Sequence, residues 1–141
     1  MARKSELPAF RKKRNVLFGE KTSKDALRET GRQYLEAKRY YDALEFFQRA
    51  GADSDTRKVA EIAIEAGDTP LYMRVKKVLK EQGSEQEWSR LAVNAERAGL
   101  YSAAYLAHMK AGHDEEAARL RQSIPGMAPQ QAAEGEGEAG Q

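Results

Sequence analysis

The chain of 141 residues lacks cysteine altogether and contains only two histidines. Without cysteine there are no disulfides, thiolate zinc sites or thiol nucleophiles. The basic N-terminus is not followed by the apolar run of about 7–15 residues that a secretory signal needs. No apolar stretch approaches the ~20 residues that span a bilayer. We therefore expect a cytoplasmic protein without integral membrane association.

Residue patterns that carry chemistry are also scarce. His108 and His113 are separated by Gly112, so their rings need not share a helix face, and we expect no metal site. The five glycines between residues 51 and 112 lie 13–16 residues apart, too far for a phosphate-binding loop. Nothing suggests a Ser-His-Asp constellation. The sequence therefore predicts no enzymatic activity and no cofactor.

Charge is abundant but uneven along the chain. The formal net charge is +2, and charged residues make up 33% of the chain. Residues 1–24 contain eight Lys/Arg and two Glu, whereas residues 125–141 contain three Glu and no Lys/Arg. We expect residues 1–22 to form a flexible basic arm and residues 125–141 a disordered acidic tail, because neither has enough apolar surface to bury. The folded domain is predicted to span residues 23–124.

Between these ends the pattern is helical, and no alternation typical of strands appears. Glycine recurs at Gly51, Gly67, Gly83, Gly99 and Gly112, where it can end helices in the left-handed conformation. Ser23 and the Ser84–Glu87 box are start signals, as are Thr69-Pro70 and Asp114. The predicted helices span 24–38, 40–50, 54–66, 70–82, 85–98, 100–111 and 114–123.

The helices also repeat a motif in pairs. Leu27-x2-Thr30-Gly31-x2-Tyr34 is followed by Ala43-x3-Phe47, and Trp88-x2-Leu91-Ala92-x2-Ala95 by Ala104-x3-His108. This pattern resembles the tetratricopeptide repeat (TPR), in which W-x2-L-G-x2-Y precedes A-x3-F. The middle unit, with Ala60 and Tyr72, matches less well. The resemblance implies an all-α, short TPR-like α-solenoid of about three helix pairs, 23–51, 53–83 and 84–112, with a C-terminal capping helix.

The small residues of the motif are expected where two helices cross closely, since larger side chains would push the helix axes apart. They are Gly31, Ala43, Ala60, Ala92 and Ala104. The large residues beside them are expected to fill the core. Phe46 is the aromatic that this register leaves unexplained. It could bury against the next unit or serve as a surface contact.

The resemblance also implies a function. In TPR-like stacks the first helix of each pair lines a concave groove that binds partner segments. The chain would then be a non-catalytic protein–protein interaction adaptor or scaffold that binds an acidic or partly apolar segment. Carried over by register, the groove-facing residues are Arg28, Arg32, Leu35, Arg57, Glu61, Ile64, Ser89, Val93 and Arg97.

The N-terminal arm supports an alternative function. Its basic cluster and a nearby aromatic could contact phosphates and stack on bases, as in an RNA- or ribosome-associated protein. The residues are Arg11, Lys12, Lys13, Arg14 and Phe18. The fourth predicted helix adds a basic face with Arg74, Lys76, Lys77 and Lys80. Docking of the arm to a protein, no binding role for it, and self-association through an unstacked end remain open alternatives.

Overall fold

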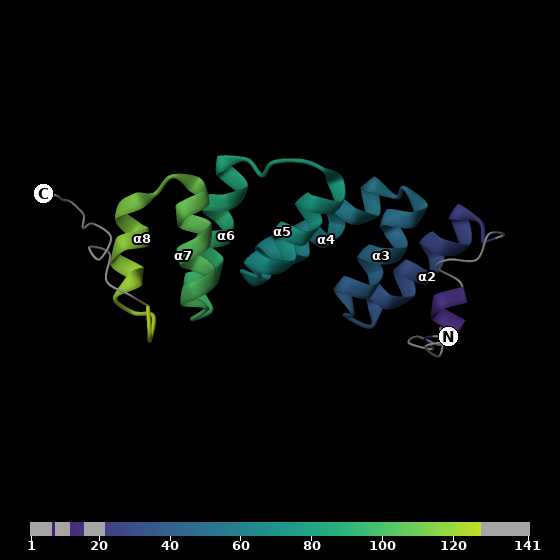
Figure 1. Cartoon of the computed structure of the whole chain (residues 1–141), viewed down its shortest axis with the longest axis horizontal. Coiled ribbons are helices and arrows are strands. Elements are labelled where there is room, and N and C mark those ends of the chain that lie inside the picture. The colour runs from purple at the N-terminus through teal and green to yellow at the C-terminus, as the bar shows by residue number, and fades with distance from the viewer. Residues whose placement is uncertain (1–6, 8–11, 16–21, 128–141) are drawn as a thin grey trace, which may run out of the picture. The chain divides into compact units, whose positions relative to one another are not determined.

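The computed structural model describes residues 7, 12–15 and 22–127, and this part of the chain is all-α, with no strand. Residues 12–15 form a single helical turn. The longer helices, labelled in Figure 1, are α2 (Lys24–Glu36), α3 (Tyr40–Ala50), α4 (Asp53–Ala66), α5 (Thr69–Leu79), α6 (Glu85–Arg97), α7 (Tyr101–Ala111) and α8 (Asp114–Arg121). Their bounds lie within three residues of those predicted. None of these described helices is long and apolar enough to cross a membrane.

Six helices end in the same way, with a residue in the left-handed conformation. The residues are Lys38, Gly51, Gly67, Lys80, Gly99 and Gly112. After each one, the next backbone N–H donates to the carbonyl five residues earlier, at 2.8–3.0 Å. This is the Schellman arrangement. The glycine pattern therefore predicted four of the six ends. It missed Lys38 and Lys80, and Gly83 does not occupy such a position.

Helix starts follow the sequence signals in part. The Ser23 hydroxyl accepts a hydrogen bond from the Ala26 N–H at 3.0 Å, and Ser84 forms a complete capping box with Glu87. The cap of α5 is Asp68, whose carboxylate accepts from the Leu71 N–H at 3.1 Å. Thr69 instead donates to the Ala103 carbonyl. Helix α8 begins at Asp114 without a side-chain cap, so Asp114 does not have the predicted capping role.

The chain divides into two compact units, and α4 and α5 contribute to both. Unit 1 contains the residues up to Glu61 together with Met73–Glu81. Unit 2 contains Ile62–Tyr72 together with the residues from Gln82 onward. Each unit is described by itself.

In unit 1, α2 and α3 form a tight pair. A Cβ atom at Gly31 would lie 2.6 Å from the Phe47 ring, so only glycine permits this approach. Phe46 is fully buried and stacks on Tyr34 with ring centroids 5.2 Å apart. This settles the open question about Phe46, which is a core residue and not a surface contact. Arg74 of α5 lies over the ring of Tyr41 of α3.

In unit 2, the turn between α4 and α5 packs against α6. The Asn94 side-chain amide donates to the Ile64 carbonyl at 2.7 Å. A Cβ atom at Gly67 would overlap the backbone of Ala95. Tyr72 meets Trp88 edge to face, with ring centroids 4.8 Å apart, and Gly83 leaves room for both rings.

The predicted small positions Ala43, Ala60, Ala92 and Ala104 are all buried. Together with Gly31, they confirm that the motif places small side chains in the core. The close contact at Gly67 was not among the predicted crossings. There the left-handed end of α4 at Gly67 lies directly against the backbone of Asn94 and Ala95 in α6.

Candidate functional site

The arginines predicted for the first-helix face of unit 1 converge on one buried carboxylate. Arg28 Nε lies 2.9 Å and Arg32 Nε 3.1 Å from the oxygens of Asp55, which is 2% exposed. Burial alone would raise the pKa of Asp55, but hydrogen bonds from Arg32 and Arg28 outweigh it and the pKa is lowered. These two arginines therefore join α2 to α4.

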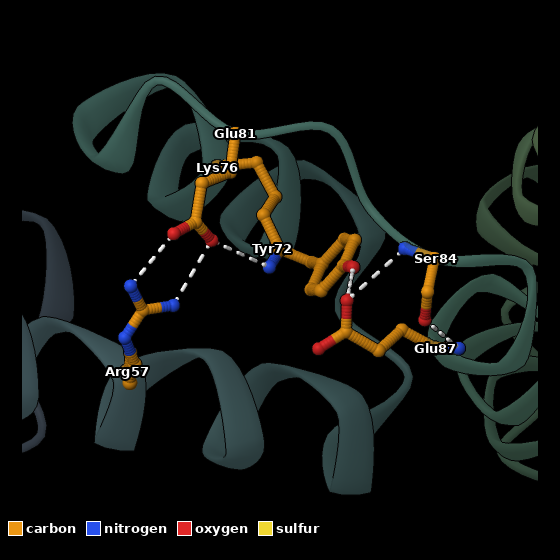
Figure 2. Close-up of polar contacts among 6 residues, drawn as sticks. All are labelled: Arg57, Tyr72, Lys76, Glu81, Ser84 and Glu87. Atoms are coloured by element: carbon orange, nitrogen blue, oxygen red, sulfur yellow. Dashed lines mark hydrogen bonds and ion pairs between the residues drawn. The ribbon is translucent and has the colours of Figure 1, made fainter.

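Arg57 is also tied to a carboxylate of its own unit. Its guanidinium donates to both oxygens of Glu81 at 3.0 and 2.6 Å, and Lys76 adds a contact at 3.3 Å (Figure 2). The hydrogen bonds from Arg57, supported by Lys76, lower the pKa of Glu81 from 4.5 to about 2. Glu81 belongs to the segment after α5, which the sequence assigned to a longer helix ending at 82.

Figure 2 also shows a second carboxylate cluster, in unit 2. The Tyr72 hydroxyl donates to Glu87 Oε1 at 2.6 Å, and the Ser84 N–H donates to the same oxygen at 3.2 Å. Glu87 thus links the start of its own helix, α6, to α5. This geometry is a structural junction, since each polar group is satisfied within the protein.

The remaining predicted groove residues differ in exposure. Leu35 is half-buried and Glu61 is exposed. Ile64 is fully buried and offers no surface to a partner, so its prediction as a groove-facing residue is wrong. Its side chain belongs to the core because α4 turns this position toward the interior of unit 2.

Helix α6 carries the predicted surface residues of unit 2. Val93 is 48% exposed, and Arg97 donates to the Asn94 side chain at 3.3 Å. Ser89, Arg90, Val93 and Asn94 line a shallow hollow of about 300 Å³. The sequence register identified Ser89 and Val93. It missed Arg90 and Asn94, which lie one position further along on the same stripe of the helix.

A larger hollow of about 850 Å³ lies elsewhere in unit 2. It is formed by the α4–α5 turn, the α6–α7 turn and the segment after α8, and its lining is mostly apolar. Leu100 and Tyr101, both exposed, contribute to it. This site was not predicted from the sequence, although an apolar pair directly after Gly99 is a visible signal.

The two histidines lie close together, although Gly112 separates them in the sequence. His113 Nδ1 is 3.3 Å from His108 Nδ1, because the Schellman turn at Gly112 folds His113 back onto the end of α7. Ser89 Oγ lies 3.4 Å from His113 Nε2. Among the described residues, no group of three or more His, Cys, Asp or Glu side chains is arranged to hold a metal ion.

The basic arm is described only in part. Lys13 pairs with Asp42 at 2.6 Å and Glu45 at 3.3 Å, and it lies over the Tyr34 ring. The hydrogen bond to Asp42, helped by Glu45, raises the pKa of Lys13. Lys12 and Arg14 are exposed. Arg11 and Phe18 lie outside the described residues, as do most of the predicted arm and residues 128–141 of the predicted tail.

The ion pairs of unit 1 predict a specific loss of stability in acid. Because the folded-state pKa of Glu81 is about 2 against an ordinary value of 4.5, the unfolded chain binds more protons than the folded chain between these values. The free energy of unfolding should therefore fall as pH drops through that window. The lowered pKa of Asp55 acts in the same direction.

Urea titrations of the wild type and Glu81→Gln across pH 2–7 check this expectation, with Glu29→Gln on the exposed face of α2 as the matched control. The Glu81→Gln substitution should flatten the pH dependence below pH 4.5 and lower the free energy of unfolding above it, where the wild type keeps the charged pair with Arg57. Equal acid sensitivity in all three proteins would contradict the role given to the Arg57–Glu81 pair.

Comparison with known proteins assigns neither a family nor a function to the chain. No protein-family model, no curated protein and no solved structure matches the chain.

Proposed function

We propose that the chain is a non-catalytic adaptor, built as a divergent TPR-like helical repeat, that binds a segment of a partner protein. The regular helix ends support the repeat. Lys38 and Gly51 are 13 residues apart, and so are the next two pairs of left-handed residues, Gly67 with Lys80 and Gly99 with Gly112. Three successive helix pairs thus carry the same turn geometry at the same internal spacing, which is typical of repeat architectures.

Contacts between alternate helices support the same proposal. In unit 1, α2 meets α4 through Asp55, and α3 meets α5 through Tyr41. In unit 2, α4 meets α6 through Asn94, and α6 meets α8 where Glu96 pairs with Arg119 at 3.0 Å. Thr69 joins α5 to α7. A stack of helix pairs buries its apolar faces by such neighbour contacts.

The exposed Val93 on α6 is the observation that carries the binding proposal. It is a half-exposed β-branched side chain at the edge of the hollow that Ser89, Arg90 and Asn94 complete. Arg97 follows one turn later. An apolar side chain of the partner would fit against Val93, with a neighbouring carboxylate placed toward the Arg97 guanidinium. This composition fits an acidic, partly apolar segment bound to a helix face.

The expected test result is that Val93→Asp weakens partner capture about tenfold or more, that is by about 1.4 kcal/mol, because the new carboxylate would be buried against the partner's apolar side chain and would repel its acidic group. Met109→Asp is the matched control, since Met109 is similarly exposed but lies on α7. Partners are first identified by affinity purification with the full chain, and affinities are then measured with the purified partner. If Val93→Asp and Met109→Asp bind the purified partner equally well, the α6 face is not the binding surface.

Val93 is a cleaner probe than the arginines of unit 1. Changing Arg28 or Arg32 to Glu would place a second carboxylate beside the buried Asp55, and a loss of binding could then reflect a loss of folding. Circular dichroism of Val93→Asp should be unchanged, because the side chain leaves no cavity in the core.

The same affinity purification, repeated with nuclease treatment, tests the RNA-binding alternative. Lys13 is engaged with Asp42 and Glu45, so one of the arm's cations is already neutralised within unit 1. Partners that disappear on nuclease treatment, with binding that falls steeply as salt rises, would support the alternative and contradict the adaptor proposal.

A further inference from the structure

The paired imidazoles of unit 2 form an arrangement that the adaptor function does not use. His108 lies in the last turn of α7 and its side chain is 6% exposed, whereas His113 precedes α8 and its side chain is 32% exposed. Their Nδ1 atoms face each other across 3.3 Å. The site therefore has one buried wall and one side open to solvent.

The separation of the two nitrogens matches a coordination distance. Two imidazole nitrogens bound at about 2.0–2.1 Å to one tetrahedral ion lie about 3.3–3.4 Å apart. A hydrogen bond between the two nitrogens also fits 3.3 Å, so the distance alone does not choose between a proton and a metal. The oxygen atoms beside the two Nε2 atoms favour the metal.

The outer nitrogen of each ring, Nε2, lies close to an oxygen atom of another residue. His108 Nε2 lies 3.5 Å from Glu96 Oε1; it is buried and forms no hydrogen bond. His113 Nε2 lies 3.4 Å from Ser89 Oγ and 3.9 Å from Glu85 Oε2. Metal-bound histidines usually direct the other ring N–H at a carboxylate or another oxygen, which fixes the tautomer.

The tautomer with both protons on Nε2 would leave two lone pairs pointing into the same gap. If each ring keeps its proton on Nε2, toward Glu96 or toward Ser89 and Glu85, neither Nδ1 carries a proton. The two Nδ1 lone pairs then repel each other, and a cation between them removes the repulsion. A single shared proton also removes it, but only if one ring carries both protons or gives up the outward N–H.

We propose that His108 and His113 bind a divalent transition-metal ion of the zinc, nickel or copper class through their Nδ1 atoms. Imidazole nitrogen suits these ions. Glu96 lies beside His108 Nε2, and Arg119 holds Glu96 through a contact at 3.0 Å. The ion enters from the exposed side of His113, and water fills its remaining positions. This inference does not depend on the proposed adaptor function.

The composition of the chain makes the test simple. It has no cysteine, and these are its only two histidines, so an imidazole-dependent site in an untagged protein has a single possible location. Isothermal titration of the metal-free full chain with ZnCl₂ at pH 7.5 should show one ion per chain. His113→Asn should lower the affinity at least tenfold, and Ser89→Ala, which keeps both ligands, should bind within a few-fold of the wild type.

Binding of zinc by His113→Asn with wild-type affinity would overturn the proposal, because the ion would then sit on surface carboxylates. Absence of binding to the wild type would overturn it as well, and would leave a hydrogen-bonded pair that shares one proton. A second measurement needs no variant. In ¹⁵N spectra of the wild-type imidazoles, zinc should shift the two Nδ1 signals; a shift of the Nε2 signals instead would contradict the geometry.

Discussion

Phe46→Ala is expected to lower the free energy of unfolding by about 3–5 kcal/mol, the usual cost of truncating a buried phenylalanine. Phe46 is fully buried in unit 1 and stacks on Tyr34, so the change removes both apolar burial and a ring contact. Denaturation by urea, followed by far-ultraviolet circular dichroism, measures the loss. Partner binding should be unaffected under conditions where the variant is still folded.

Tyr41→Ala is the matched control on the same helix. Tyr41 is 46% exposed and its ring lies under the Arg74 guanidinium, a surface contact worth about 0.5–1 kcal/mol. A loss at Phe46 no larger than the loss at Tyr41 would show that Phe46 is not part of the core. The same result would revive the interpretation of Phe46 as a surface contact.

Gly67→Ala should destabilise unit 2 by about 2–5 kcal/mol. The substitution adds two costs: a left-handed backbone, at φ +70°, costs a non-glycine residue about 1–2 kcal/mol, and overpacking adds about 1–3 kcal/mol. Overpacking is expected because the new Cβ would lie 2.5 Å from the backbone nitrogen of Ala95. A backbone cannot swing away as a side chain can, so α6 itself would have to shift. Trp88, the single tryptophan, is buried in this unit and reports the change by fluorescence.

The Gly99→Ala variant separates the cost of the left-handed backbone from the cost of overpacking. Gly99 has a similar backbone, at φ +77°, but a Cβ there would meet nothing within 4 Å. This variant should lose only the conformational cost. If Gly67→Ala and Gly99→Ala lose equal stability, the close approach of the α4–α5 turn to α6 is wrong.

The structure gives the predicted arginines a role that affects how binding data are read. Arg28, Arg32 and Arg57 all pair with carboxylates of unit 1, at Asp55 or Glu81. Loss of binding on their mutation is informative only if folding is shown to be intact. The α6 surface around Val93 does not have this difficulty, since Val93 is an exposed apolar side chain.

Local signals in the sequence determined where helices begin and end. Ser23 and Ser84 cap helices as their side chains predict, and glycine at 51, 67, 99 and 112 ends them. These features depend on residues within one turn of each other, so a single sequence contains the information. The left-handed Lys38 and Lys80 were missed because lysine has no preference for that conformation. Their conformation is imposed by the turn.

Tertiary contacts determined the rest. Whether Phe46 is buried, whether Arg28 and Arg32 share Asp55, and whether Ile64 faces inward all depend on residues 12 or more positions away. The histidine pair shows the limit most clearly. His108 and His113 are close in sequence, yet the left-handed turn at Gly112 is what directs their rings toward each other. Helix α6 supplies oxygen atoms beside their Nε2 atoms. Periodicity predicts which face of a helix is apolar, but the partner of each polar atom is decided by the packing of separate helices.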